Sequence, residues 1–292
     1  MQTGILLLDK PLGLSSNAAL QRVRRLLGAA KAGHVGSLDP LATGMLPICL
    51  NEATKIAGDI LSGKKCYRFS IGLGTRTATG DAEGTVVESL PVPIFKEDEI
   101  KIVLNGFLGR QSQVPPMYSA LKQRGQPLYR LARAGQVVDR SPREIDITSL
   151  TLLSFDESVL CLEVICSKGT YVRTLAEDVA RTLGTCGYVT SLRRLYVEPF
   201  IAEPMHSLES IGALRSVGQW PPVLPADLAV GHLPAVRLDA AGSLRLLHGQ
   251  AVAMHAAALG GRVRLYDESG RFLGMGETDG QGYVRPRRLF VL

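Results

Sequence analysis

The sequence brings three side chains capable of chemistry within six residues of one another. Residues 31–44 read KAGHVGSLDPLATG and contain His34, Ser37 and Asp39. A histidine, a serine and an aspartate are the residue types of a nucleophilic hydrolase. However, a single short loop does not ensure their alignment, and the sequence has no GxSxG turn. Taken alone, Asp39 before Pro40 is typical of a turn or helix cap, and His34 of a loop histidine.

Two glycine-rich stretches resemble nucleotide-binding loops only superficially. Residues 58–64, GDILSGK, have the spacing of a phosphate-binding loop, but Lys65 stands where Ser or Thr would hold Mg²⁺. A predicted helix precedes this stretch and a predicted strand follows it, so no helix N-terminus faces a phosphate. Residues 72–77, GLGTRT, lack the third glycine of a dinucleotide fingerprint. We therefore expect no nucleotide cofactor.

Cysteine and histidine are arranged unlike a metal site. The five cysteines form no CxxC pair, and the five histidines form no His-x3-His pattern. Reduced, mostly buried thiols are typical of a cytosolic protein. The N-terminus has no basic region ahead of its short apolar run, and no apolar run reaches the length of a membrane span. We expect a cytoplasmic protein without metal or membrane partner.

Composition indicates a folded chain with a modest basic excess. The 292 residues are 46% apolar and 21% charged, which excludes a disordered or collagen-like chain. The 33 basic residues exceed the 27 acidic ones by six, and 24 of them are Arg. Arginine suits bidentate contact with phosphate, so this balance is compatible with a nucleic-acid partner without requiring one.

Apolar periodicity predicts the elements that must position the loop. Residues 31–44 contain three Gly and one Pro and are expected to be irregular. A helix capped by Ser15 or Ser16 is expected to end at Gly28. We predict strands over 5–8, 66–72, 147–155, 159–166 and 191–197, and helices over 51–61, 97–108 and from 169 to Gly184.

The stretch from 111 to 144 is unusually basic and contains two tyrosines. Its basic residues are Lys122, Arg124, Arg130, Arg133, Arg140 and Arg143. Such a segment can follow a nucleic-acid backbone, or it can be an exposed surface excursion; its composition leaves both open.

A change in composition predicts a second domain. Residues 201–234 contain five prolines and weak periodicity, which predicts a connector on the surface. Beyond Pro234, short strands separated by glycines predict a β-rich domain of about sixty residues. We place the boundary at 232, between domains 1–232 and 233–292.

The loop and several other segments together resemble one enzyme family. Residues 33–47, GHVGSLDPLATGMLP, are similar to the catalytic loop of the TruB family of tRNA pseudouridine synthases, GHxGxLDPxAxGxLP. Val35 and Ser37 are conservative departures. Further similar segments, in chain order, are GILLLDKPLGLSS from Gly4, KCYR from Lys65, PMYSALK from Pro116, CSKGTYVRT from Cys166, LRR from Leu192, and FLGMG with PRR near the C-terminus.

The resemblance implies a fold, an activity and partners. The fold would be α+β, a large mixed, mainly antiparallel sheet flanked by helices, followed by a small β-barrel PUA domain. The activity would be isomerisation of uridine-55 in the tRNA T-loop to pseudouridine, without cofactor or metal. A thumb at about 115–143 would close on the T-stem-loop, and the PUA domain would contact the acceptor stem. A monomer acting without guide RNA is expected.

The resemblance also implies roles for individual residues. Asp39 would be the catalytic carboxylate, paired with Arg173, and Tyr67 would stack on the target base. His34 would fill the hole left by the flipped base. Lys65, Lys168, Leu192 and Arg193 would contact the base or the RNA. Two alternatives stay open: a binding-only RNA chaperone on the same scaffold, and a synthase that depends on a guide RNA.

Overall fold

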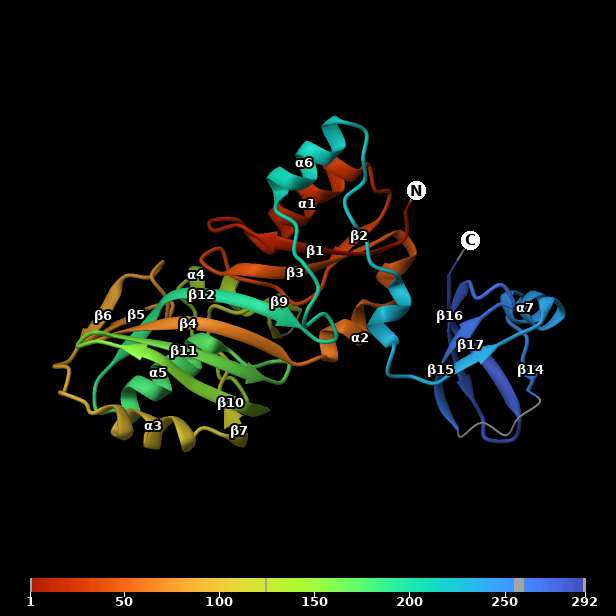
Figure 1. Ribbon diagram of the computed structural model, residues 1–292. Helices are drawn as coiled ribbons and strands as arrows, with labels where there is room; N and C mark the ends of the chain where they lie inside the picture. The colour runs from red at the N-terminus through yellow and green to blue at the C-terminus, as the bar shows by residue number, and fades with distance from the viewer. Residues whose placement is uncertain (1, 124, 255–259, 291–292) are drawn as a thin grey trace.

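The computed structural model describes residues 2–123, 125–254 and 260–290. Its larger sheet has eight strands, seven of them in the order β1-β3-β12-β4-β11-β10-β7, with β2 paired to β3 (Figure 1). Every neighbouring pair in this sheet is antiparallel except β12 and β3, which run parallel. The strands are β1 Gly4–Lys10, β2 Ala32–His34, β3 Thr43–Leu50, β4 Lys65–Leu73, β7 Gly109–Gln113, β10 Arg143–Phe155, β11 Val159–Cys166 and β12 Gly187–Val197. The expected large, mainly antiparallel sheet is confirmed.

Helices cover the sheet on one face and at one end. Helices α3 and α5 pack together beneath the central strands, and α1 and α6 lie beside β1 and β2 (Figure 1). Their bounds are α1 Ser16–Leu27, α3 Glu97–Asn105, α5 Val172–Thr182 and α6 Leu208–Ser216. The opposite face of β4, β11 and β12 is polar, for example at Arg68 and Glu163, which form an ion pair. The functional side chains on these strands therefore belong to the helix-covered face.

Local sequence signals explain why the predicted helices form where they do. Ser15 caps α1 by accepting from the Ala18 backbone N–H, and Gly28 ends the helix in the left-handed conformation. Gly184 has the same conformation after α5, as predicted. The predicted helix at 51–61 consists of a 3₁₀ segment, η1 Asn51–Ile56, followed by the short α2 Ala57–Ser62.

Two predictions for irregular structure were wrong. The 31–44 stretch contains β2 and the first residues of β3, a strand that Gly44 and Pro47 concealed. The 201–234 stretch is not a surface connector, because Leu208 and Ile211 of α6 are buried in the main core. Residues 226–230, the 3₁₀ helix η2 Ala226–Val230, also contribute buried side chains to a second core. Both helices are short and have prolines on either side, so neither contains enough sequence for its periodicity to be recognised.

A five-stranded sheet forms the C-terminal half-barrel, in the order β13-β15-β16-β17-β14. Its elements are β13 Ala235–Arg237, α7 Ala240–Leu247, β14 Val252–Ala253, β15 Gly261–Tyr266, β16 Phe272–Thr278 and β17 Tyr283–Leu289. Met275 and Phe290 pack in the second core with Ile60 of α2. Arg262 and Asp59 form an ion pair of 2.7 Å across the same junction. Helix α2 therefore lies between the large sheet and the C-terminal sheet (Figure 1).

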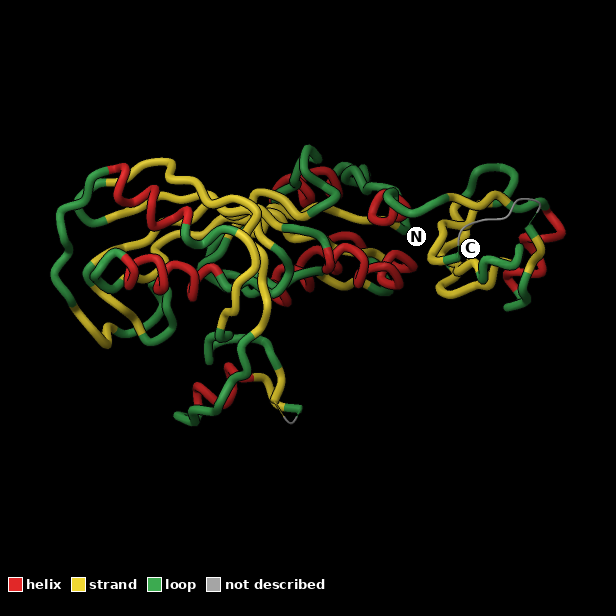
Figure 2. The backbone as a smooth tube through the Cα atoms, turned by 90° about the horizontal axis from the view of Figure 1, so that it is seen from below, coloured by secondary structure: helices red, strands yellow, loops and turns green. Residues whose placement is uncertain are grey.

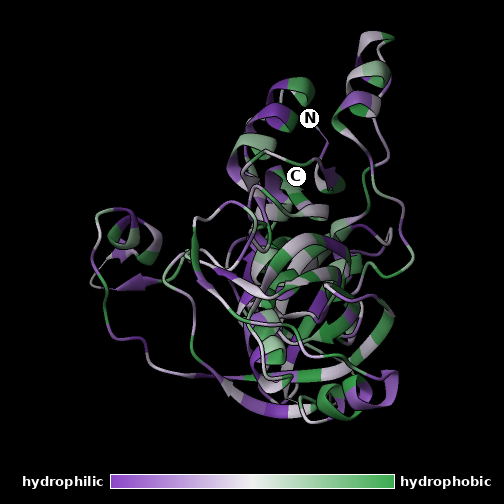
Figure 3. Ribbon diagram, turned by 90° about the vertical axis from the view of Figure 1, so that its left-hand side faces the viewer, coloured by the Kyte–Doolittle hydropathy of each residue, from purple (hydrophilic) through white to green (hydrophobic). Residues whose placement is uncertain are grey.

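Residues 114–142 project from the body between β7 and β10. Figures 2 and 3 show this projecting segment as an arm that carries α4 Leu128–Arg133 and the short strands β8 Lys122–Gln123 and β9 Gln126–Pro127. Position 124 lies outside the described residues. No helix in the described ranges is long and apolar enough to cross a membrane.

Candidate active site

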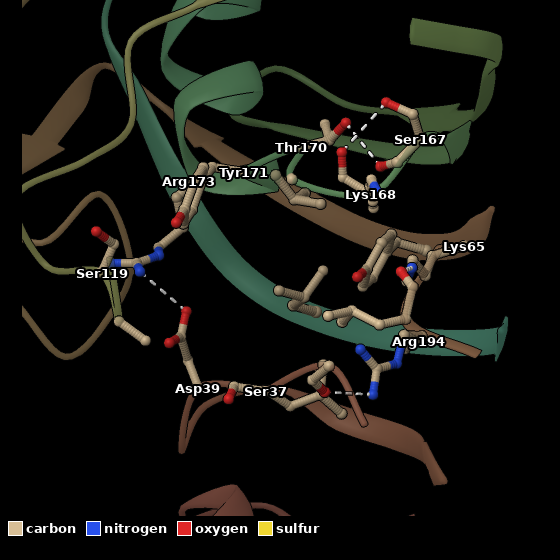
Figure 4. Close-up of a pocket in the computed structure, with 18 of the residues that line it drawn as sticks. Ser37, Asp39, Lys65, Ser119, Ser167, Lys168, Thr170, Tyr171, Arg173 and Arg194 are labelled. Atoms are coloured by element: carbon tan, nitrogen blue, oxygen red, sulfur yellow. Dashed lines mark hydrogen bonds and ion pairs between the residues drawn. The ribbon is translucent and has the colours of Figure 1, made fainter. Parts of the chain in front are cut away.

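A cavity of about 410 Å³ opens at the N-terminal end of α5 (Figure 4). Its walls come from β4, β12, the 167–171 turn and the loop over 35–42, with residues 119–121 of the projecting segment above. A volume of this order suits a small organic ligand or a single nucleoside. The polar side chains around it are Ser37, Asp39, Lys65, Tyr67, Ser119, Ser167, Lys168, Thr170, Tyr171, Arg173 and Arg194.

Backbone and side-chain hydrogen bonds fix the loop that carries Asp39. The Ser16 hydroxyl accepts from the Leu38 N–H at 2.7 Å and donates to the Leu38 carbonyl at 2.9 Å. The carbonyl of Pro40 accepts from the Gly13 N–H and from the Lys10 ammonium. Lys10 is fully buried and also donates to two other carbonyls of its own turn. The loop is therefore preorganised by the β1 turn and by α1.

Asp39 and Arg173 form the central ion pair of the cavity. The Arg173 Nη2 atom lies 3.0 Å from the Asp39 Oδ2 atom, as Figure 4 shows. Arg173 is almost completely buried and also donates to the carbonyls of Thr79, at 2.7 Å, and Tyr118, at 2.6 Å. A second carboxylate, Asp81, lies 3.5 Å from its Nη1 atom. The guanidinium is thus fixed from four directions and oriented toward Asp39.

The environment of Asp39 opposes its ionisation. Although 44% of its side-chain surface is accessible, the enclosing protein displaces enough water to raise the pKa of Asp39 above its ordinary value. Arg173 and Lys10 act in the opposite direction, and the negative charge of Asp81 adds to the increase. A carboxylate with a raised pKa is a stronger base, which suits a group that accepts a proton or attacks carbon.

Tyr67 and Arg194 lie on adjacent central strands and face the same cavity. They are direct register partners of β4 and β12. Burial raises the pKa of Tyr67, while the positive charge of Arg194 opposes this increase. Arg194 itself is 1% exposed and donates to the carbonyls of Met45, at 2.7 Å, and Gly36, at 2.9 Å.

Two lysines line the side of the cavity nearest α2. Lys65 is buried and donates to the carbonyls of Leu61 and Gly63, at the end of α2. Burial and the neighbouring charge of Arg194 lower the pKa of Lys65 to about 8. Lys168 is exposed at the cavity rim, where its ammonium lies 3.4 Å from the Ser62 hydroxyl. Lys168 is therefore the more accessible cation for an anionic ligand.

The structure gathers most, but not all, of the residues singled out from the sequence. Asp39, Tyr67, Lys65, Lys168, Leu192 and Arg173 all line the cavity. Arg193 does not, because side chains alternate along β12 and its guanidinium binds Asp9 with both nitrogens, at 3.0 and 2.8 Å. His34 also lies outside the lining, on β2, where its Nδ1 atom is buried and has no hydrogen-bond partner among the described residues.

Sequence reasoning missed two charged residues of this site. Arg194 was seen only as part of the LRR segment, yet it lines the cavity where Arg193 does not. Asp81 was not singled out, yet its carboxylate lies 3.5 Å from the Arg173 Nη1 atom. Strand alternation anchored on buried Leu192 could have identified Arg194. No local signal identifies Asp81, because its contact with Arg173 spans more than ninety residues. Within the described ranges, no three His, Cys, Asp or Glu residues gather as metal ligands.

Comparisons with known proteins agree over nearly the whole chain. The family model for the N-terminal domain of TruB family pseudouridylate synthases matches residues 24–172. The model for the C-terminal domain of pseudouridine synthase II TruB matches residues 234–290. The tRNA pseudouridine synthase B of Chromohalobacter salexigens is 49% identical over 98% of this chain and 94% of its own. The corresponding protein of Aromatoleum aromaticum is 50% identical over 98% and 92%.

Solved structures share the fold at lower sequence identity. A chain of an H/ACA ribonucleoprotein bound to a substrate RNA containing 2′-deoxyuridine matches with a TM-score of 0.74 and 22% identity, covering 99% of this chain and 86% of its own. A chain of an archaeal box H/ACA complex gives a TM-score of 0.72, with the same identity and coverage. These matches confirm the expected pseudouridine synthase fold. The chain belongs to the TruB family of pseudouridylate synthases.

Proposed function

We propose that this protein isomerises the T-loop uridine of tRNA, conventionally position 55, to pseudouridine. The observation that carries the proposal is the Asp39–Arg173 ion pair, 3.0 Å long, at a cavity whose size suits one flipped nucleoside. Relatives that share about half of the residues over nearly the whole chain are named tRNA pseudouridine synthase B. Their names supply the tRNA substrate of this proposal.

The reaction needs few groups, and the cavity contains them. The bond from ribose C1′ to N1 breaks, the base turns, and a bond from C1′ to C5 forms. The C5 proton is lost and N1 gains a proton, so no redox equivalent is consumed. Asp39 attacks C1′ or the base, or removes the C2′ proton; the geometry is compatible with all three routes. Arg173 orients Asp39, and Tyr67 stacks on the base and takes the C5 proton.

The other residues singled out from the sequence contact the RNA in this proposal. We assign Lys168 and Lys65 to phosphate or structural contacts and Leu192 to apolar contact with the base. His34 and Arg193 lie outside the cavity lining, where they contact the RNA around the flipped nucleotide. His34 fills part of the space that the base vacates. An imidazole can stack and still form a hydrogen bond at neutral pH.

Larger segments grip the tRNA in this proposal. The projecting segment closes over the T-loop, and its Tyr118 carbonyl already contacts Arg173 at 2.6 Å. The C-terminal domain, from about 233, contacts the acceptor stem through its basic residues. A monomer in the cytoplasm performs the reaction without guide RNA. Backbone contacts of this kind predict that Kd for tRNA rises steeply with salt.

Release of tritium from a tRNA transcript labelled at uridine C5 tests the proposal directly. The purified protein alone should release one tritium per transcript, and none from a transcript with cytidine at position 55. Asp39→Asn should abolish release while tRNA binding persists. Asp98→Asn, a matched change on the exposed first turn of α3, should leave release unchanged. Turnover by Asp39→Asn would overturn the assignment of the carboxylate.

The same assay separates the two alternatives. Binding and refolding of tRNA without tritium release would identify an RNA chaperone that has lost catalysis. Release only after addition of a guide RNA would identify a guide-dependent synthase, the class represented by the H/ACA structures.

A further inference from the structure

Arg194 is a buried charge that has no carboxylate partner in the described part of the chain. It is the largest side chain among the fully buried residues, with 1% of its surface exposed. Among the described residues, its guanidinium donates to two neutral backbone carbonyls, those of Met45 and Gly36. Throughout the ranges that the structure describes, no Asp or Glu oxygen lies within 4.0 Å of its guanidinium. Buried charges are normally paired, because desolvation is costly.

The two carbonyls hold the guanidinium in a fixed plane. The Met45 carbonyl belongs to β3 and the Gly36 carbonyl to the loop that carries Asp39. Gly36 lies so close that a Cβ atom there would be 3.1 Å from the Arg194 Nη1 atom. Figure 4 shows the side chain between Ser37 and Lys65, on the opposite side of the cavity from the Asp39–Arg173 pair. Arg194 is therefore a preorganised positive charge that neither Asp39 nor Asp81 neutralises.

Arg194 shares its face of the sheet with Tyr67. Arg194 and Tyr67 are opposite one another in the antiparallel ladder of β12 and β4, so their side chains are neighbours on one face. Burial of Tyr67 disfavours its oxyanion, and Arg194 is the largest influence favouring that oxyanion. The cost of burying an unpaired guanidinium is thus offset where an oxyanion forms beside it.

We propose that Arg194 is a positioning residue that orients the Tyr67 hydroxyl and stabilises its oxyanion during loss of the C5 proton. The inference rests on the proposed function. The hydroxyl proton first leaves to water. The ionised oxygen then takes the C5 proton, and the C–H electron pair becomes the C5–C6 double bond. The electrons of the C6–N1 double bond move to N1, which takes a proton from water, so the step balances.

A purely structural role would predict different behaviour. In that case Arg194 would only fasten β12 to β3 and to the Asp39 loop through its two carbonyl contacts. Its loss would lower stability and affect all catalytic groups alike. A role through Tyr67 instead predicts that the loss of rate depends on the presence of the Tyr67 hydroxyl.

The first experiment is a double-mutant cycle on single-turnover tritium release with saturating enzyme. Arg194→Met should slow release by about 10- to 100-fold, as expected when a charge-assisted contact to a reacting group is lost. Tyr67→Phe should also slow release. In the Tyr67→Phe background, Arg194→Met should cause little further loss. Arg68→Met, an arginine on the opposite face of β4, is the matched control and should retain the native rate.

The second experiment restores the acidity of residue 67 without Arg194. A fluorinated tyrosine at position 67 has a more acidic hydroxyl, so it should recover much of the rate that Arg194→Met loses. Should Arg194→Met fail to fold by circular dichroism, Arg194→Lys keeps the charge but loses the planar fork. In Arg194→Lys, the part of the pH–rate profile where the rate rises with pH should lie at higher pH than in the native protein. The fluorinated tyrosine should move it back to lower pH.

Three results would overturn the inference. They are a native rate in Arg194→Met, independent and multiplicative losses in the cycle, and a pH profile of Arg194→Lys that coincides with the native one. Absence of tritium release by the native protein would instead reject the proposed function, so the two failures are distinguishable.

Discussion

At the scale of single residues, the central feature is one arginine shared by two unequal carboxylates. Arg173 contacts Asp39, which is open to the cavity, and Asp81, whose side chain is 3% exposed. Asp81 accepts a hydrogen bond of 2.5 Å from the Thr79 hydroxyl, so its position is fixed from the protein side. Asp81 neutralises part of the charge of Arg173. Arg173 therefore lowers the pKa of Asp39 less than it would without Asp81, and Asp39 stays more basic.

This arrangement predicts the pH dependence of turnover. Enclosure and the charge of Asp81 raise the pKa of Asp39, so the carboxylate becomes protonated, and inactive, at a pH above the ordinary aspartate value of about 3.9. The acid limb of kcat for tritium release should therefore lie above that value. Asp81→Asn removes a like charge and should move the limb to lower pH. An acid limb at the native pH or at a higher pH in Asp81→Asn, with the fold intact by circular dichroism, would contradict this account.

The sequence identified the chemistry of the site better than its geometry. Asp39, Tyr67 and Arg173 are recognisable by motif, and the structure brings all three to one cavity. The motif alone did not separate Arg193 from Arg194, because adjacent strand residues face opposite sides. The separation required the alternation that buried Leu192 sets on β12. Asp81 depends on a long-range contact that no local pattern encodes.

At the scale of elements, β12 is the strand on which the site depends. It pairs with β4 along most of its length but with β3 only at Thr43 and Gly44. The sequence predicted β4 from its alternation, and it also predicted much of β12. It failed at β3 because that strand is buried along nearly its whole length, shows no alternation, and contains a proline.

Close approach of β3 and β12 at Gly44 predicts a specific sensitivity. Gly44 has φ of 96°, and a Cβ atom there would overlap the backbone carbonyl of Arg194. Gly44→Ala should therefore lower the free energy of unfolding by more than ~2 kcal/mol, because both strain and displacement of β12 contribute. Gly28→Ala is the control: its φ of 60° is also left-handed, but nothing lies within 4 Å. It should cost about 1 kcal/mol.

Urea unfolding followed by circular dichroism measures both variants. Gly44→Ala should also lose tritium release, since Arg194 is displaced with β12. Equal costs for the two substitutions would show that the backbone conformation alone requires glycine at position 44.

At the scale of the whole molecule, the C-terminal domain is packed into the first domain. Phe290 and Met275 share a buried cluster with Ile60. The Lys55 ammonium donates to the Leu289 carbonyl at 2.6 Å, and the Asp59–Arg262 ion pair lies beside it. The two domains should therefore unfold together.

Phe290→Ala tests this coupling through the single tryptophan of the chain. Trp220 follows α6 in the first domain, so its fluorescence does not report directly on the C-terminal sheet. Loss of the buried ring should cost about 3–5 kcal/mol and shift the Trp220 transition to lower urea concentration. Tyr283→Ala, at a half-exposed position in β17, should leave the transition in place. A fixed Trp220 transition in Phe290→Ala would mean that the domains unfold independently.

The central place of β12 also has a consequence for biosynthesis. Arg194 follows Met45, its hydrogen-bond partner, by 149 residues, and β12 fills the gap in the sheet between β3 and β4. A nascent chain therefore carries two unpaired strand edges until the ribosome has released residue 197, the last of β12. Until then the wall formed by Leu192 and Arg194 is missing. An emerging chain cannot capture a tRNA in this cavity before its own sheet has closed.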